Sequence, residues 1–340
     1  MREKQRLKVL IVDDSRVYRE VLVRGLSSDP DLHIVGTAVD PFDARDKLLE
    51  LRPDVMICDI QMPKMDGIEF LKRLLPQYSL PVIVVSTVST AVFDALQAGA
   101  VDFVCKPDVQ SAFGVEQFLL QLIHKVKIAA QAKVSAAEDL PETKASPSGS
   151  FQMGQVIVLG ASTGGTEAIA SILSRLPAAM PGIVIVQHIP PLFSKMFADR
   201  LHVSTGFSVK EAQTGDLVEP GKVLIAPGDR HLRIRKSGTA LQVECFEGER
   251  VNGHCPSIDV LFDSAAKICG SSAIGVLLTG MGYDGARGLL AMRRKGARTI
   301  GQDEPSSTVY GMPKAAYEIG AVEKQTSLER LPHILCSMLK

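Results

Sequence analysis

A serine, a histidine and an aspartate each follow a short apolar run in the second half of this sequence. Ser162 stands in GASTGG after the run VIVL, His188 ends the run IVIVQH, and Asp284 lies in a glycine-rich turn after IGVLLTG. Such runs predict buried parallel strands, whose carboxyl ends meet at one edge of a sheet. A hydroxyl, an imidazole and a carboxylate gathered there could serve as nucleophile, general base and orienting acid. The pattern therefore indicates a serine hydrolase.

The glycine-rich segment around Ser162 could instead bind a phosphate or form a plain structural turn. A Walker-type loop would end in Lys followed by Ser or Thr, but residues 160–168 contain no lysine, and a G-x-G-x-x-G fingerprint is also absent. Gly160-Ala161-Ser162-Thr163-Gly164 fits the G-x-S-x-G nucleophile elbow between a strand and a helix. The chain order Ser162, His188, Asp284 differs from the Ser, Asp, His order of ordinary α/β hydrolases, which predicts a different fold.

Each of these residues also has a structural interpretation. His188 alone could be a satisfied histidine at a strand end, and Asp284 alone could cap a helix. Together with the elbow, those interpretations become the weaker ones. Four other polar residues near turns fit binding or structural roles better. They are His231 and His254, which could line the cleft, and Ser306 and Ser307 in a polar loop. Cys255 fits a packing role.

A second group of polar residues follows the predicted strands of the first half. Predicted strands cover 8–13, 33–38, 54–58, 81–86 and 101–104, each followed by a helix-like segment. The carboxylates of Asp13, Asp14 and Asp59 lie at the ends of two of these strands. Three carboxylates at one sheet edge repel one another unless a hard cation is present, so the pattern predicts a Mg²⁺ site. Any one of these residues alone could be a helix cap or a solvated surface group. The group consists of Asp13, Asp14, Asp59, Ser86 and Lys106.

Residues 8 to about 125 resemble a response-regulator receiver domain, through VDDS (12–15), DIQMPKMDG (59–67), Ser86 and DFVCKP (102–107). The resemblance implies that Asp59 accepts a phosphoryl group from a histidine kinase. It also implies that Ser86 and Lys106 bind the phosphoryl oxygens and that Phe103 changes its packing after phosphorylation. A half-buried strand residue is the alternative for Phe103. The implied Mg²⁺ ligands are Asp14, Asp59 and the backbone carbonyl of Gln61, with Asp13 acting through water.

Residues 154 to about 340 resemble the catalytic domain of the chemotaxis protein-glutamate methylesterases. The shared stretches are GASTGG (160–165), QHIP (187–190), APG..HL (226–232), PS.D.LF (256–262), LTGMG.DGA.G (278–288) and YGMP.AA (310–316). The resemblance implies a triad of Ser162, His188 and Asp284. It places the Met281 amide in the oxyanion hole, with Thr163 lining it. The implied substrates are glutamate γ-methyl esters of chemoreceptors, and the same chemistry would deamidate receptor glutamines. No cofactor is implied for the esterase chemistry.

The chain of 340 residues is long enough for two α/β domains. We expect a (βα)₅ receiver with a doubly wound parallel sheet at 1–128, and a doubly wound, mostly parallel catalytic domain at 154–340. Residues 129–153 lose all periodicity and predict a flexible linker. Strands at 156–159, 183–187, 223–226 and 274–279 are the clearest of the second half, and 230–250 predicts a hairpin.

Bulk composition excludes several classes of protein. Basic and acidic residues balance, 38 against 38, so nothing forms the positive surface that nucleic-acid binding requires. The N-terminus fits neither a signal peptide nor a membrane span, and the six cysteines show no CxxC pair. We expect a cytoplasmic monomer with reduced thiols that approaches the membrane only through its receptors.

The same residues leave rival functions open. A triad fixes the reaction better than the substrate, so a receiver-gated hydrolase of another ester or amide is the main alternative. A phosphorylation-dependent binding protein with an unused triad is a second one, and a transcription factor is the weakest. The resemblance further implies that the receiver restrains the catalytic domain until it is phosphorylated.

Overall fold

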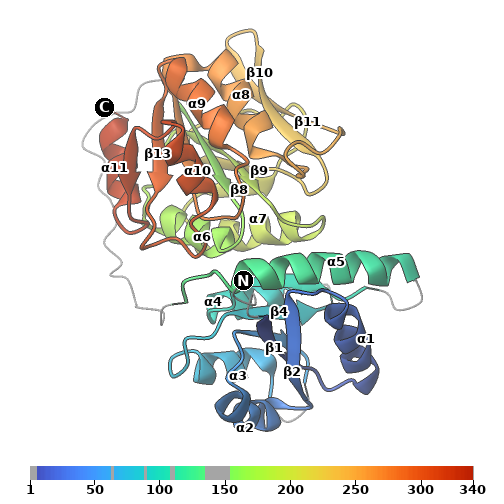
Figure 1. Ribbon diagram of the computed structural model, residues 1–340. Coiled ribbons are helices and arrows are strands. Elements are labelled where there is room, and N and C mark those ends of the chain that lie inside the picture. The colour runs from blue at the N-terminus through green and yellow to red at the C-terminus, as the bar shows by residue number, and fades with distance from the viewer. Residues whose placement is uncertain (1–5, 63–64, 88–89, 108–111, 135–153, 340) are drawn as a thin grey trace. The chain divides into compact units, whose positions relative to one another are not determined.

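The computed structural model describes residues 6–62, 65–87, 90–107, 112–134 and 154–339. The chain divides into two compact units, Met1–Asp139 and Leu140–Lys340 (Figure 1). Most of the predicted linker, from 135 to 153, lies outside the described residues. Among the helices of the described part, none combines the length and the apolar character needed to cross a membrane.

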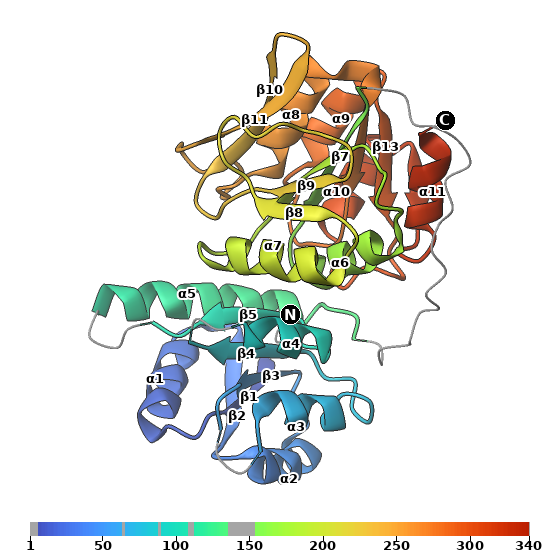
Figure 2. The same ribbon diagram turned by 180° about the vertical axis from the view of Figure 1, so that it is seen from behind.

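The first unit is a five-stranded parallel sheet with the order β2-β1-β3-β4-β5. Helices α1 and α5 lie on one face and α2, α3 and α4 on the other (Figures 1 and 2). Strands β3 and β4 are buried along their whole length, as strands covered on both faces must be. The elements are β1 (Leu7–Val12), α1 (Arg16–Ser27), β2 (Leu32–Ala38), α2 (Pro41–Leu51), β3 (Val55–Asp59), α3 (Gly67–Leu74), β4 (Val82–Ser86), α4 (Ala91–Gln97), β5 (Asp102–Cys105) and α5 (Ala112–Ala129).

The second unit is built on a seven-stranded parallel sheet with the order β14-β13-β12-β6-β7-β9-β8. The antiparallel hairpin of β10 and β11 stands apart from it. The elements are β6 (Val156–Ala161), α6 (Gly165–Arg175), β7 (Gly182–Gln187), α7 (Phe193–Ser204), β8 (Ser208–Glu211), β9 (Lys222–Ile225), β10 (His231–Ser237), β11 (Ala240–Phe246), α8 (Ile258–Ile268), β12 (Ala273–Leu277), α9 (Ala286–Arg294), β13 (Arg298–Gln302), α10 (Met312–Glu318), β14 (Lys324–Thr326) and α11 (Leu331–Met338), with a short 3₁₀ turn at Gly270–Ser272.

The chain order within the second sheet creates a switch point between β6 and β12. From β6 the chain proceeds to β7 and to the edge strand β8, and β9 is then added between those two strands. The chain next crosses to β12 on the other side of β6 and continues to β13 and β14. In open α/β sheets, the crevice at the carboxyl ends of the strands at such a point is the usual ligand site. The three candidate catalytic residues follow β6, β7 and β12.

The predicted α/β class with two parallel sheets is confirmed, and the predicted hairpin is β10–β11. All five predicted strands of the first half are present within two residues of their expected bounds. The sequence analysis missed three strands of the second sheet, β8, β13 and β14. Two of them, β8 and β14, are short, partly exposed edge strands, so they carry no long apolar run.

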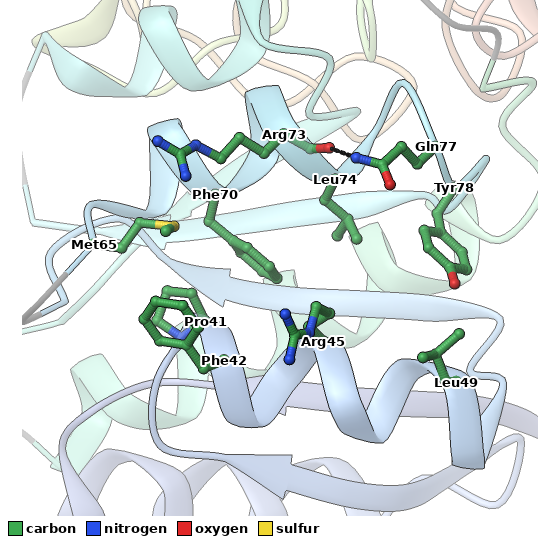
Figure 3. Close-up of a pocket in the computed structure, with 10 residues that line it drawn as sticks. All are labelled: Pro41, Phe42, Arg45, Leu49, Met65, Phe70, Arg73, Leu74, Gln77 and Tyr78. Atoms are coloured by element: carbon green, nitrogen blue, oxygen red, sulfur yellow. Dashed lines mark hydrogen bonds between the residues drawn. The ribbon is translucent and has the colours of Figure 1, made fainter.

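An apolar groove of about 260 Å³ lies between α2 and α3 of the first unit. Figure 3 shows Phe42 and Leu49 on one side of it and Phe70 and Leu74 on the other. Arg45 and Arg73 also line it, and each pairs with a carboxylate of its own helix, Asp46 and Glu69. The groove is formed by helices rather than by strand ends, so it belongs to neither polar cluster.

Candidate functional site

Ser162 lies on a tight turn between β6 and α6. Its N–H donates to the Thr279 carbonyl at 3.0 Å, and its own carbonyl accepts the Gly165 N–H at 2.7 Å. Gly164 has a left-handed backbone, with a φ of 76°, and a Cβ there would lie 2.3 Å from Thr308 Oγ1. Glycine is therefore required at this position, and the turn presents the serine at the sheet edge, as the G-x-S-x-G pattern predicts.

His188 is adjacent to Ser162 because their strands are paired. Ala161 at the end of β6 is opposite Gln187 at the end of β7, and the two candidate residues directly follow these strand ends. His188 N–H donates to the Ala161 carbonyl at 3.1 Å, and Gln187 Nε2 donates to the Ser162 carbonyl at 2.9 Å. The backbones of the two residues are thus fixed side by side.

The imidazole of His188 uses one nitrogen and leaves the other open. Nε2 lies 3.0 Å from Asp284 Oδ2, and only 9 % of the side chain is exposed. Nδ1 is buried and has no hydrogen-bond partner among the described residues, so no bond joins it to Ser162 here. Because Nε2 faces the carboxylate, Nδ1 is the nitrogen left to accept a proton. Catalytic hydrogen bonds of free enzymes often form only when substrate binds.

Asp284 is buried, and every side of its carboxylate is hydrogen-bonded. Oδ2 accepts the His188 ring and the Ile258 N–H, the latter at 2.7 Å. Oδ1 accepts the Ser257 hydroxyl and Asn252 Nδ2, both at 2.8 Å, and the Asp259 N–H at 3.3 Å. Ile258 and Asp259 begin α8, so Asp284 caps the N-terminus of that helix and not of α9, which follows it in sequence.

These donors set the ionisation of Asp284. Burial alone would raise the pKa of Asp284, but the hydrogen bonds and charge of His188 and the donors of Asn252 and Ile258 hold this pKa well below its usual range. Asp259 has a raised pKa, because of its burial and the nearby Asp284, even though it accepts the Gly288 N–H at the start of α9. Asn252 Nδ2 bridges the two carboxylates, at 2.8 Å from each.

The expected oxyanion residues lie near Ser162. A Cβ on Gly280 would approach the Ser162 Cβ to 2.6 Å, so the backbone before Met281 passes directly beside the serine. The Met281 N–H makes no hydrogen bond within the described residues. Thr163 is buried, and its carbonyl accepts the Thr279 hydroxyl at 3.0 Å.

The other candidates weighed in the sequence have different positions. His231 is buried, accepts the Ser257 N–H at Nδ1 and lies 2.9 Å from the Glu249 carbonyl at Nε2, which is a structural role. Ser306 and Ser307 both bond to Asp303 within their own loop. Sequence reasoning missed Asn252 and Ser257 as partners of Asp284.

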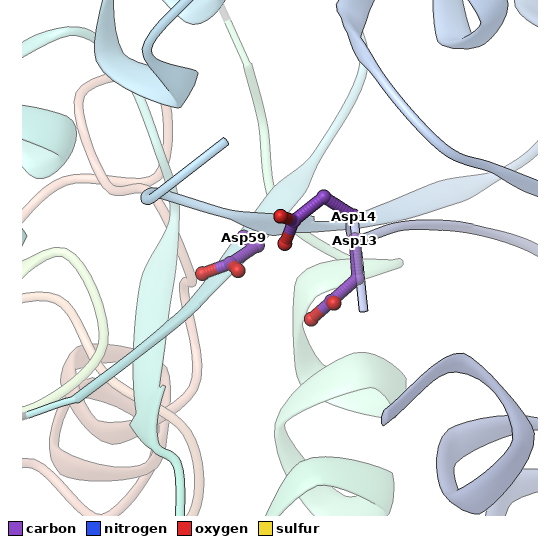
Figure 4. A group of neighbouring side chains, drawn as sticks. All are labelled: Asp13, Asp14 and Asp59. Carbon is purple, nitrogen blue, oxygen red and sulfur yellow. The ribbon is translucent and has the colours of Figure 1, made fainter. Parts of the chain in front are cut away.

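The carboxylates of the first unit meet at the ends of β1 and β3. Figure 4 shows Asp13 and Asp14 after β1 and Asp59 at the end of the adjacent strand β3. One oxygen from each lies within 4.8 Å of the others. The donors are all hard oxygens, which suits Mg²⁺. The sequence-predicted cluster is thus brought together, with Asp13 and Asp59 buried and Asp14 exposed.

The Lys106 ammonium and the Ser86 hydroxyl, both predicted to belong to this cluster, lie at the same sheet edge. Lys106 Nζ is 2.8 Å from Asp13 Oδ2 and 2.6 Å from Asp59 Oδ2. Ser86 ends β4, and its buried hydroxyl has no hydrogen-bond partner among the described residues. Gln61 donates its N–H to Asp59 Oδ1 at 3.3 Å. Phe103 on β5 is 3 % exposed, so it is buried rather than half-buried.

The electrostatics of this cluster favour an added cation. Burial raises the pKa of Asp59, and the Asp13 charge raises it further, although Lys106 opposes both effects. The pKa of Lys106 is raised because its bonds to Asp13 and Asp59 outweigh its own burial. A carboxylate with a raised pKa beside another carboxylate is a site where a divalent ion relieves repulsion.

Two family models match the two units. Residues 157–335 match the model described as CheB methylesterase, and residues 9–113 match the response regulator receiver domain. The solved catalytic domain of Thermotoga maritima CheB methylesterase is 37% identical, with a TM-score of 0.54, and the match covers 55% of this chain and 100% of that one.

Full-length relatives share both units. A protein-glutamate methylesterase/protein-glutamine glutaminase 2 of Syntrophomonas wolfei is 53% identical over 337 residues, which is 98% of each chain. A protein-glutamate methylesterase/protein-glutamine glutaminase of Syntrophotalea carbinolica is 48% identical over 346 residues, again 98% of each. The protein-glutamate methylesterase/protein-glutamine glutaminase 4 of Anaeromyxobacter dehalogenans is 51% identical over 342 residues, which is 98% of this chain and 96% of that one. This chain belongs to the family of CheB methylesterases, the protein-glutamate methylesterase/protein-glutamine glutaminases.

Proposed function

We propose that this chain hydrolyses glutamate γ-methyl esters of chemoreceptors, deamidates receptor glutamines, and is switched on by phosphorylation of its receiver. The single observation that carries the esterase proposal is the His188–Asp284 pair, 3.0 Å apart at the switch point beside Ser162. Membership of the family supplies the substrate class, and the geometry supplies the chemistry.

The proposed reaction starts with attack by Ser162 on the ester carbonyl. His188 Nδ1 takes the serine proton, and the ring becomes an imidazolium cation. Asp284 stabilises that cation through Nε2, and its lowered pKa keeps it ionised throughout. The His188 proton then passes to the leaving methoxide, and methanol departs.

Negative charge on the tetrahedral intermediate would be stabilised by backbone donors. The Met281 N–H lies one residue beyond Gly280, whose backbone is against Ser162, and makes no hydrogen bond within the described residues. One such donor typically contributes about 3 kcal/mol to the transition state. Thr163 lines the same turn. Water activated by His188 then cleaves the acyl-enzyme and releases glutamate. With a glutamine substrate the leaving group is ammonia.

In the receiver, Asp59 would be the phosphoryl acceptor. Its carboxylate attacks phosphorus of a phosphohistidine on the donor kinase, the P–N bond breaks, and an acyl phosphate forms. Asp14, Asp59 and the Gln61 carbonyl would hold Mg²⁺, assisted by Asp13. The ion, when bound, neutralises charge on the phosphoryl oxygens. Lys106 and the partnerless Ser86 hydroxyl would bind those oxygens.

The test of this proposal is selectivity between esters. Methyl-esterified receptor cytoplasmic fragments and p-nitrophenyl acetate are offered to the protein, and a fluorophosphonate probe reports whether Ser162 is reactive. We expect rapid methanol release and probe labelling at Ser162. Labelling with turnover of p-nitrophenyl acetate alone would indicate a hydrolase of another substrate. No labelling would remove Ser162 as the nucleophile and leave a binding protein.

A further inference from the structure

We propose that His254 is a positioning residue for the esterase reaction: its imidazole, stacked on that of His188, sets the rotation of the His188 ring and so aims Nδ1. This inference rests on the proposed function, because it assigns no reaction to His254 itself. The two ring centroids are 3.8 Å apart and the ring planes differ by 7°. Such a face-to-face contact covers one side of the base.

The bond to Asp284 alone does not fix this ring. A histidine ring turns about its Cβ–Cγ bond, and the preference about that bond is broad. Nε2 lies near the extension of that axis, so the His188–Asp284 bond changes little as the ring turns. Nδ1 lies farther from the axis and moves more. Since Nδ1 has no partner among the described residues, it has no hydrogen bond of its own to hold it.

A flat group against the ring face supplies the missing constraint. Turning the His188 ring would drive one of its edges into the His254 ring, 3.8 Å away. A parallel stack therefore opposes the motion that the carboxylate bond permits. The lone pairs and N–H bonds of both rings lie in the ring planes, so the stack passes no proton between them. His254 thus acts through His188 and not as a second base.

The loop that carries His254 is itself fixed to the same site. The backbones of Val251 and His254 exchange two hydrogen bonds of 3.0 Å, closing a turn in which Asn252 has a φ of 54° and Gly253 one of 83°. Asn252 bonds to Asp284, and so does Ser257, farther along the loop. One segment therefore holds the carboxylate at the ring edge and the imidazole at the ring face.

The test compares a flat substitute with one that is not flat. His254→Phe keeps a planar face without nitrogen, and His254→Leu fills a similar space without one. We expect His254→Leu to lower kcat roughly 10- to 100-fold with KM little changed, the size of a small misalignment of a catalytic group. His254→Phe should stay within about threefold of the wild type. His333→Ala, at an exposed histidine of α11, is the control for loss of an imidazole.

Each variant is assayed as the full chain, on methylated receptor fragments and on p-nitrophenyl acetate, and its fold is checked by circular dichroism. A kcat for His254→Leu within twofold of wild type would overturn the proposal, as would a His254→Phe variant as slow as His254→Leu. If His254→Leu does not fold, His254→Ala replaces it. Ring alignment matters for any ester, so a wild type active only on p-nitrophenyl acetate would contradict the proposed substrate while this test continued on that ester.

Discussion

Both units bury an aspartate at the carboxyl end of a parallel sheet, but they surround it differently. Asp284 accepts hydrogen bonds from five groups, including two N–H groups at the start of α8, and its pKa is lowered. Asp59 accepts Lys106 and the Gln61 N–H beside another carboxylate, and its pKa is raised. Burial is similar, with 2 % and 4 % exposed, so the number of donors and the neighbouring charge decide the direction.

The difference matches two kinds of work. A carboxylate saturated with donors remains an anion and fixes the position of the ring nitrogen that it contacts, which suits the partner of a general base. A carboxylate with few donors, a neighbouring lysine and a partnerless hydroxyl nearby has room for a new ligand. This contrast supports the proposal that the receiver cluster accepts a charged group, whereas the hydrogen bonds of the Asp284 carboxylate are already complete. Four substitutions test this contrast.

The largest effect is expected from Ser162→Ala, which removes the proposed nucleophile. We expect kcat for methanol release to fall by roughly 10⁶-fold, as in other serine hydrolases that lose the nucleophile. The fold should persist by circular dichroism, since no hydrogen bond of the Ser162 hydroxyl is present in the described part of the chain. Ser237→Ala, at an exposed serine of the hairpin, should retain full activity. Substantial turnover by the Ser162 variant would move the nucleophile elsewhere.

Asp284→Asn should have the next largest effect. The amide cannot carry the charge that stabilises the His188 imidazolium. Its NH₂ group would also face hydrogen-bond donors that the wild-type carboxylate accepts. We expect kcat to fall roughly 10⁴-fold, a size seen when a triad aspartate becomes asparagine. The matched control is Asp263→Asn, at an exposed carboxylate of α8. A variant that keeps a tenth of the wild-type kcat would show that the saturated carboxylate is structural only.

Asp59→Asn tests the open site. We expect it to abolish both phosphoryl incorporation from a small phosphodonor and the rise in esterase rate that the donor causes, because the amide is not a nucleophile. Incorporation is measured with labelled donor and Mg²⁺. Asp46→Asn, at a carboxylate that is 68% exposed, should behave as wild type. Undiminished labelling of the Asp59 variant would contradict the assignment.

Ser86→Ala should give the smallest and most divided effect. The hydroxyl is buried without a partner in the described chain, so its removal should raise the free energy of unfolding of the unphosphorylated receiver by up to about 1 kcal/mol. Urea unfolding measures that gain. The same change should weaken the donor-dependent rise in activity a few-fold, because the phosphoryl oxygens lose one hydrogen bond. Ser27→Ala on the exposed face of α1 is the control. A loss of stability would mean that the hydroxyl is bonded in the resting protein.

The sequence predicted the strands that are continuous apolar runs. It missed β13, an inner strand with four of its five residues buried, because its sequence RTIGQ mixes polar and apolar residues. Runs such as VIVLGA and GIVIVQ are continuous apolar segments, and they became β6 and β7. The missed β8 is the tetrapeptide SVKE and β14 is KQT, whose exposed positions carry polar residues. An edge strand is defined by its partner, so nothing local marks it.

Within the site, residues that follow buried strands were accessible to prediction and their supports were not. Ser162, His188 and Asp284 follow strands that the sequence identifies, so their meeting can be argued from topology. Asn252 and Ser257 reach Asp284 from a loop about 30 residues away, and the path of that loop depends on the positive φ of Asn252 and Gly253. Such long-range contacts leave no periodic signal.

Substrate, chemistry and gating are tested together by methanol release from methyl-esterified receptor fragments, measured with and without a small phosphodonor and Mg²⁺. We expect release that rises when the donor is added and that returns to the basal rate when the donor is exhausted. Absence of release under both conditions, from a protein that a serine probe still labels, would contradict the assignment of the substrate.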